Sequence, residues 1–155
     1  MNDAVIALAA DHAGWELKDC LARHLGNRGY EVLDLGTNGP ESVDYPDFGA
    51  AVGEAVASGR AELGVAVCGS GIGIAMAAGK VDGIRAATVH DPTSARLARE
   101  HNDANVICLG ARLMDRPEAE ATLDAYLAAT FAGGRHQRRV DKIDALGRRC
   151  GHLGV

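Results

Sequence analysis

A cysteine stands where an apolar segment meets a run of glycines. Residues 63–67 are short and apolar, as in a buried strand, and Cys68 follows them directly. The chain then reads GSGIG at 69–73 and continues into small residues that are typical of a helix. A helix dipole favours a thiolate, and the exposed N–H groups of glycines can hold an anion. The segment could therefore supply a base or nucleophile with an anion hole, although a buried strand-end cysteine before a tight turn would show the same pattern.

Other polar side chains follow apolar segments in the same way. Five of them close such a segment or come shortly after one: Asp11, His12, His90, Asp91 and Arg112. If the apolar segments are parallel strands, the residues that follow them lie at one edge of the sheet, where ligands bind in α/β proteins. We therefore expect these side chains to share a pocket with Cys68.

A second group of candidate residues comes late in the chain. Arg135 and Arg139 are four residues apart and would share one face of a helix. Two guanidinium groups on one face suit a phosphate, although a solvated helix start would look the same. His101 and Asn102 follow a predicted helix at 94–100, and we expect them near the ligand-binding edge of the sheet.

Strand-like and helix-like segments alternate along the chain. The predicted strands are at 5–9, 32–35, 63–67, 85–89 and 106–109. The predicted helices are at 15–25, 47–58, after 73, after 92, at 117–129 and at 138–149. This alternation predicts right-handed crossovers and a three-layer α/β/α sandwich around a five-stranded, parallel, Rossmann-like sheet. We expect one domain over residues 1–155, with no role assigned to the tail from about residue 150.

Composition narrows the class of protein. The chain has 155 residues, with 21 acidic and 16 basic side chains and a formal charge of −5, which argues against nucleic-acid or membrane partners. Its four cysteines form no C-x-x-C pair, so neither a zinc site nor a disulfide framework is expected. The apolar run at 4–10 has no basic residues before it, which is typical of a strand rather than a signal peptide. We expect a cytoplasmic protein with no metal.

Several nucleotide and phosphate motifs fail on spacing. The glycine run is G-x-G-x-G rather than the dinucleotide motif G-x-G-x-x-G, although Asp91 lies about where a ribose-binding acid would be. The segment from Gly73 to Lys80 resembles a P-loop, but Val81 stands where a magnesium-binding Ser or Thr is required. A nucleotide site therefore remains an alternative that rests on the glycine turn and Asp91.

Taken together, six segments resemble the ribose-5-phosphate isomerase type B family, which includes allose-6-phosphate and galactose-6-phosphate isomerases. They are ADHAG at 10–14, DYP at 44–46, CGSGIG at 68–73, GIRA at 83–86, EHNDAN at 100–105 and GGRHQ at 133–137. No single segment is specific, but all six occur in the family's order and spacing. They cover nearly the whole chain to about residue 149.

The resemblance implies an aldose–ketose isomerase that works through an enediolate. Its implied catalytic residues are Cys68 as the base for C1 and C2, Ser70 as an oxyanion donor, and His101 with Asp11 for opening the sugar ring. The implied substrate-binding residues are His12, Tyr45, Gly69, Gly71, Ile72, Gly73, Asn102, Arg112, Arg135 and Arg139. Among these, His12 and the three arginines would hold the phosphate.

The same resemblance sets expectations for cofactors and partners. It implies no metal or organic cofactor, a phosphosugar as the small-molecule partner, and a homodimer or dimer of dimers with the pocket between subunits. Some branches of the family use a Glu base and lack this cysteine, whereas Cys68 is present here. Ribose 5-phosphate is the expected substrate. Erythrose 4-phosphate, erythrulose 4-phosphate and allose 6-phosphate are alternatives, as is a non-catalytic nucleotide-binding domain.

Overall fold

The computed structural model describes residues 3–151, and the side chains within that range up to residue 147. Five parallel strands form one sheet in the order β2-β1-β3-β5-β4. Their bounds are Val5–Ala10 (β1), Glu31–Asp34 (β2), Leu63–Cys68 (β3), Ala86–Thr88 (β4) and Val106–Gly110 (β5). The predicted five-stranded parallel sheet is confirmed. The predicted tail without a role falls on residue 150 and beyond, outside the described side chains.

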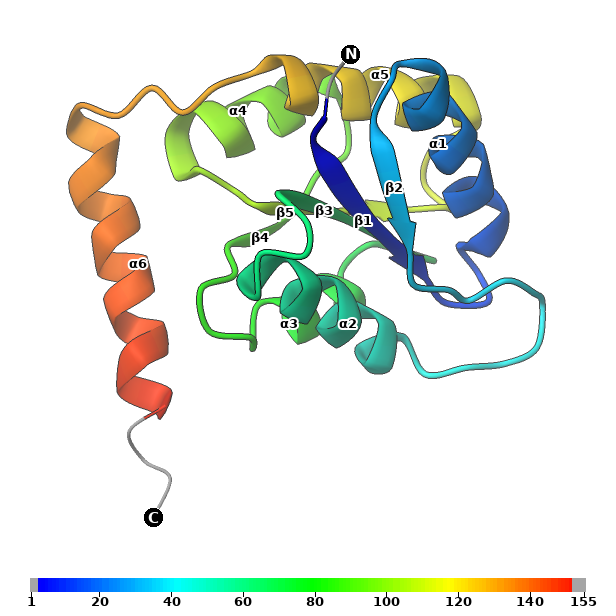
Figure 1. The fold of residues 1–155 in the computed structure, drawn as a ribbon, viewed down its shortest axis with the longest axis horizontal. Helices are drawn as coiled ribbons and strands as arrows, with labels where there is room; N and C mark the ends of the chain where they lie inside the picture. The colour runs from blue at the N-terminus through cyan, green and yellow to red at the C-terminus, as the bar shows by residue number, and fades with distance from the viewer. Residues whose placement is uncertain (1–2, 152–155) are drawn as a thin grey trace.

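Helices cover both faces of the sheet (Figure 1). Their bounds are Trp15–Asn27 (α1), Tyr45–Ala57 (α2), Gly73–Ala78 (α3), Pro92–Asn102 (α4), Arg116–Ala128 (α5) and Arg135–Gly151 (α6). Helices α1, α4 and α5 pack on one face, whereas α2 and α3 pack on the other. The predicted three-layer sandwich is therefore confirmed.

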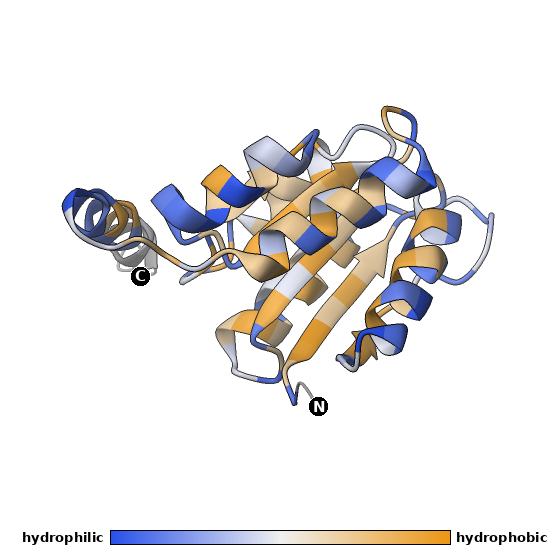
Figure 2. Cartoon of the chain, turned by 90° about the horizontal axis from the view of Figure 1, so that it is seen from above, coloured by the Kyte–Doolittle hydropathy of each residue, from blue (hydrophilic) through white to orange (hydrophobic). Residues whose placement is uncertain are grey.

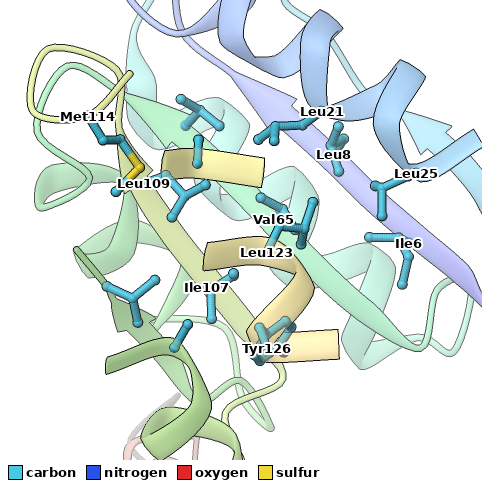
Figure 3. Close-up of a cluster of buried hydrophobic side chains, with 14 of the residues drawn as sticks. Ile6, Leu8, Leu21, Leu25, Val65, Ile107, Leu109, Met114, Leu123 and Tyr126 are labelled. Atoms are coloured by element: carbon cyan, nitrogen blue, oxygen red, sulfur yellow. The ribbon is translucent and has the colours of Figure 1, made fainter. Parts of the chain in front are cut away.

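Alternation along the strands divides the hydrophobic core into two layers. In β1, Ile6 and Leu8 face α1 and α5, whereas Ala7 and Ala9 face α2 and α3. Figure 3 shows the first layer, where Tyr126 of α5 closes one end of the cluster. In Figure 2 the strands carry mostly hydrophobic colours and the hydrophilic residues gather on helices and loops. Burial on both faces explains why β1, β3 and β5 read as continuous apolar runs in the sequence.

The short helix α3 packs directly on the backbone of α2. A Cβ atom on Gly49 would lie 2.6 Å from the carbonyl oxygen of Ile74, and one on Gly53 would lie 3.2 Å from the carbonyl oxygen of Ala78. Only glycine permits such an approach. This packing holds the glycine turn at 69–73 against the end of β3.

Helix α6 stands apart from the rest of the molecule (Figure 1). Near its middle, Arg85 donates a hydrogen bond to Asp144 at 3.0 Å. At its start, the ring of His136 stacks on the ring of His101 with centroids 4.3 Å apart. Val140 is its one residue classed as buried among the described side chains. Polar and aromatic contacts, more than a hydrophobic stripe, therefore attach α6 to the body.

Candidate active site

An open pocket of about 660 Å³ lies at the carboxyl edge of the sheet. Its lining comes from the end of β3, from the loops after β1, β3 and β5, from the start of α2 and from α3: Asp11, His12, Ala13, Tyr45, Cys68, Gly69, Ser70, Ile72, Gly73, Met76, Arg112 and Leu113. The structure thus brings together most of the residues expected to share a pocket, including the thiol, the glycine turn and one arginine. Three parallel strands end here, so the convergence follows from the topology.

Cys68 lies at the end of β3 and is 4% exposed. The backbone N–H of Gly71 donates to its Sγ at 3.1 Å. Gly71 adopts a φ of 75°, a left-handed conformation that favours glycine. Its carbonyl oxygen in turn accepts a hydrogen bond from the Thr88 hydroxyl at 2.7 Å. The turn is thereby fixed with a backbone amide that donates to the sulfur of Cys68.

Two side chains lie directly over the glycines of this turn. A Cβ on Gly69 would be 3.0 Å from the Arg112 guanidinium, and a Cβ on Gly73 would be 2.6 Å from the Tyr45 ring. Ser70 lies between them, and its hydroxyl oxygen accepts the N–H of Ile72 at 3.2 Å. The missing side chains leave room for an arginine and a phenol to border the space above Cys68.

The loop after β1 supplies a carboxylate and an imidazole. Asp11 is 6% exposed, and one of its oxygens, Oδ1, accepts the N–H groups of Ala13 at 2.9 Å and Gly14 at 3.1 Å. His12 accepts the N–H of Val43 on its Nδ1 at 3.2 Å. Both side chains are thus held by backbone amides, and both line the pocket.

The second group of predicted residues lies elsewhere in the chain. His101 and Asn102 end α4, which starts at the carboxyl edge of β4 and runs back to the amino edge of β5. The expectation that they lie near the ligand-binding edge was therefore wrong for a single chain. Arg135 and Arg139, at the start of α6, accompany them, and none of the four lines the pocket around Cys68.

His136 belongs with this second group, although no role was predicted for it from the sequence. Its ring stacks on His101 at an interplanar angle of 12°. Burial lowers the pKa of His136, and the nearby His101, Arg135 and Arg139 lower it further. Two signals in the sequence could have identified His136: its place between arginines and its place in the GGRHQ segment at 133–137.

The segment after β4 does not join the pocket either. His90 and Asp91 border a different hollow, beside Pro117 and Glu118. Asp91 caps α4, because its carboxylate accepts the Ser94 N–H at 2.6 Å. The hydrogen bonds from Ser94 lower the pKa of Asp91. The expectation that these two residues share the pocket was wrong. The Asp91 carboxylate, on which a ribose contact would depend, is instead engaged in capping α4.

Lys18 of α1 was also missed. Its side chain is fully buried, and its Nζ donates to Asp34 at 2.7 Å and to Asn38 at 3.0 Å. In the sequence it looks like an ordinary charge on an amphipathic helix. Its partners come from β2 and the following loop, 16 and 20 residues further on, so no local pattern reveals them.

The described residues also bear on metal binding and on membrane insertion. Within residues 3–151, no three or more His, Cys, Asp or Glu side chains gather in a way that could hold a metal ion. Over that same range, none of the helices has the length and apolar character needed to cross a membrane.

Comparisons with known proteins agree with this fold. The Ribose/Galactose Isomerase family model matches residues 6–143. Ribose-5-phosphate isomerase B of Escherichia coli (strain K12) is 45% identical over 144 residues, which cover 93% of this chain and 97% of that protein. The solved Clostridium thermocellum ribose-5-phosphate isomerase B has a TM-score of 0.93 at 49% identity, covering 94% of this chain and 99% of that one.

A third relative was solved with a sugar phosphate. Mycoplasma genitalium ribose-5-phosphate isomerase B, with bound ribulose 5-phosphate, has a TM-score of 0.89 at 42% identity and covers 93% of this chain and 96% of its own. The family model and these relatives span nearly the whole chain. The chain belongs to the ribose/galactose isomerase family, as the sequence motifs indicated. It is an enzyme, an aldose–ketose isomerase of sugar phosphates.

Proposed function

We propose that this enzyme interconverts ribose 5-phosphate and ribulose 5-phosphate through an enediolate, with Cys68 as the base. One observation carries the proposal: the Cys68 Sγ borders an open pocket and already accepts the Gly71 N–H at 3.1 Å. A thiolate held in this way can take a proton without a metal. The names of the relatives support this choice of sugar, as does the ribulose 5-phosphate bound in one of them.

The reaction moves one proton and one electron pair within the sugar. The Cys68 thiolate takes the proton from C2 of the open-chain aldose, and the electron pair of that C–H bond forms the C1–C2 double bond. The carbonyl electrons move to O1, where the Ser70 hydroxyl and the amides of 69–73 stabilise the charge. The thiol then returns a proton to C1, and O2 becomes the ketone carbonyl as its proton passes to O1. The redox change is internal, so no organic cofactor is needed.

Ring opening and phosphate binding need the second group of residues. We assign ring opening to His101 with Asp11, sugar oxygens to Tyr45 and Asn102, and the phosphate to four side chains. These four are His12, Arg112, Arg135 and Arg139. Within one chain the two groups lie at opposite edges of the sheet, so one chain cannot bring them together.

A homodimer, alone or paired into a tetramer, resolves this separation. In a twofold dimer the same surface serves both subunits, so the edge bearing His101 and α6 of one chain can cover the pocket of the other. Exposed apolar side chains support such a contact. Tyr45, Ile72, Met76 and Leu113 surround the pocket mouth, and Ile143 and Leu146 lie on α6. A reducing, cytoplasmic setting suits a mechanism that needs Cys68 as a free thiol.

Turnover of a set of phosphosugars tests the proposal. We expect the highest kcat/KM with ribose 5-phosphate among four-, five- and six-carbon aldose phosphates. A higher kcat/KM with erythrose 4-phosphate or allose 6-phosphate would support the same isomerase chemistry but identify a different substrate. Nucleotide binding without turnover of any sugar would contradict the proposal.

A further inference from the structure

Backbone hydrogen bonds join Gly36 and Thr37 of the loop between β2 and α2 to Ala10, and two further contacts involving side chains hold this loop on either side of its tip. At the first, the buried Lys18 ammonium donates to Asp34 at 2.7 Å and to Asn38 at 3.0 Å. Asp19 accepts a further hydrogen bond from the same nitrogen at 2.9 Å. A charge removed from water requires such partners, so the position of Asn38 is tied to the position of Lys18.

The second contact is at the far end of the loop and involves the pocket itself. The N–H of Val43 donates to Nδ1 of His12 at 3.2 Å. A nitrogen that accepts a hydrogen bond carries no proton, so the neutral ring carries its proton on Nε2. His12 lines the pocket, and this tautomer makes Nε2–H the group that it can offer to a bound anion.

We propose that these contacts form one latch, in which Lys18, Asn38 and Val43 act as positioning residues for His12. Lys18 holds the loop through Asn38, and the loop keeps the Val43 N–H on Nδ1. His12 is then fixed as an Nε2–H donor for the substrate phosphate. This inference rests on the proposed phosphosugar function, and it adds residues that do not line the pocket to the phosphate-binding apparatus.

The variant Asn38→Ala tests the latch without removing the buried charge pair, because Lys18 keeps both aspartates. We expect ¹⁵N–¹H spectra of the wild type to show His12 protonated on Nε2 alone, and those of the variant to show a mixture of tautomers. The KM for the phosphosugar should rise about three- to tenfold, as for one lost hydrogen bond, while kcat stays within about twofold. Asn38→Asp, which retains an acceptor for Lys18, should restore both readouts.

Glu41→Ala is the matched control, because Glu41 is an exposed residue of the same loop that takes no part in either contact. It should leave the tautomer and KM at wild-type values. A wild-type His12 protonated on Nδ1 would overturn the inference, as would an Asn38→Ala variant with unchanged tautomer and KM.

The spectra are recorded without turnover, so they judge the latch even if no sugar reacts. Added inorganic phosphate should shift the Nε2 signal of His12 in the wild type. If the tautomer is as expected but phosphate does not shift this signal, the result contradicts phosphate binding by His12 and not the latch.

Discussion

The thiol of Cys68 differs from that of its neighbour Cys108 in the same half of the core. Cys108 is fully buried, and burial raises the pKa of its thiol well above the ordinary value. Cys68 borders the pocket and accepts a backbone N–H. The two cysteines therefore have different chemistry, although each is next to or within a short apolar run in the sequence.

Cys68→Ala should lower turnover at least about a hundredfold, because a positioned base contributes about 10²–10⁴ in rate. Phosphosugar binding, measured by calorimetry, should change little, since the side chains proposed to hold the phosphate are other residues. The direct measurement is exchange of the C2 hydrogen with deuterated solvent, which should cease. Cys20→Ser is the control and should exchange normally. Undiminished exchange in Cys68→Ala would remove this residue from the mechanism.

The proposed role of His101 can be separated from that of Cys68 by the choice of sugar. Ribose 5-phosphate is mainly a closed furanose, whereas erythrose 4-phosphate cannot form that ring because its O4 carries the phosphate. His101→Asn should therefore lower turnover of the first sugar about a hundredfold and that of the second by less than about fivefold. Each rate is compared with the wild-type rate on the same sugar. Equal losses would place His101 in the proton transfer or in the scaffold.

At the scale of elements, the strands and helices could be predicted well from the sequence. Short apolar runs predicted all five strands, because a parallel sheet covered on both faces leaves no polar alternation to confuse the pattern. Helix ends were less certain: α6 begins at Arg135, three residues before its expected start at 138. The glycine turn was also correctly placed, since its spacing between strand and helix is local information.

Predictions that depended on distant contacts did less well. His101 was expected at the wrong edge of the sheet. Helix α4 runs antiparallel to the strands, so its last residues lie at the opposite edge from its first. The partners of Lys18 lie in another element, and the stack of His101 on His136 joins two helices. Such contacts form only when helices and strands pack against one another, so they cannot be predicted from the periodicity of the sequence.

The stack at the start of α6 should depend on pH. Burial and the nearby positive charges lower the pKa of His136, so the folded chain favours its neutral ring. The stabilisation is complete above the unfolded value of about 6.5 and is lost as the pH falls through the lowered pKa. Amide hydrogen exchange at residues 135–139, corrected for its intrinsic pH dependence, should therefore accelerate between pH 7 and pH 5.

The variant His136→Phe tests whether protonation of His136 causes this pH dependence. It keeps a flat ring against His101 but removes the group that takes up the proton. We expect its exchange at residues 135–139 to change much less over the same pH range. An identical pH response in both proteins would assign the effect to other groups.

At the scale of the whole molecule, mixing two inactive variants tests the shared site. In a dimer of one Cys68→Ala chain and one His101→Asn chain, one pocket carries both substitutions and the other carries neither. If the variants are unfolded together and refolded in equal amounts, random pairing should restore about a quarter of wild-type activity. Two batches refolded apart and assayed without exchange of subunits provide the control. No recovery in hybrids that are shown to form would place both residues in the same chain's site.

The Cys68 pocket and the group around His101 lie at opposite edges of the sheet, and this placement also affects how the enzyme responds to dilution. If neither edge of the sheet holds a complete site, a lone chain is inactive however well it is folded. Activity per chain then falls once the protein is diluted below the dissociation constant of the dimer, and saturating substrate, which bridges both subunits, shifts that threshold to lower concentration. The amount of the protein in a cell would thus set how efficiently each copy works, as well as how many copies there are.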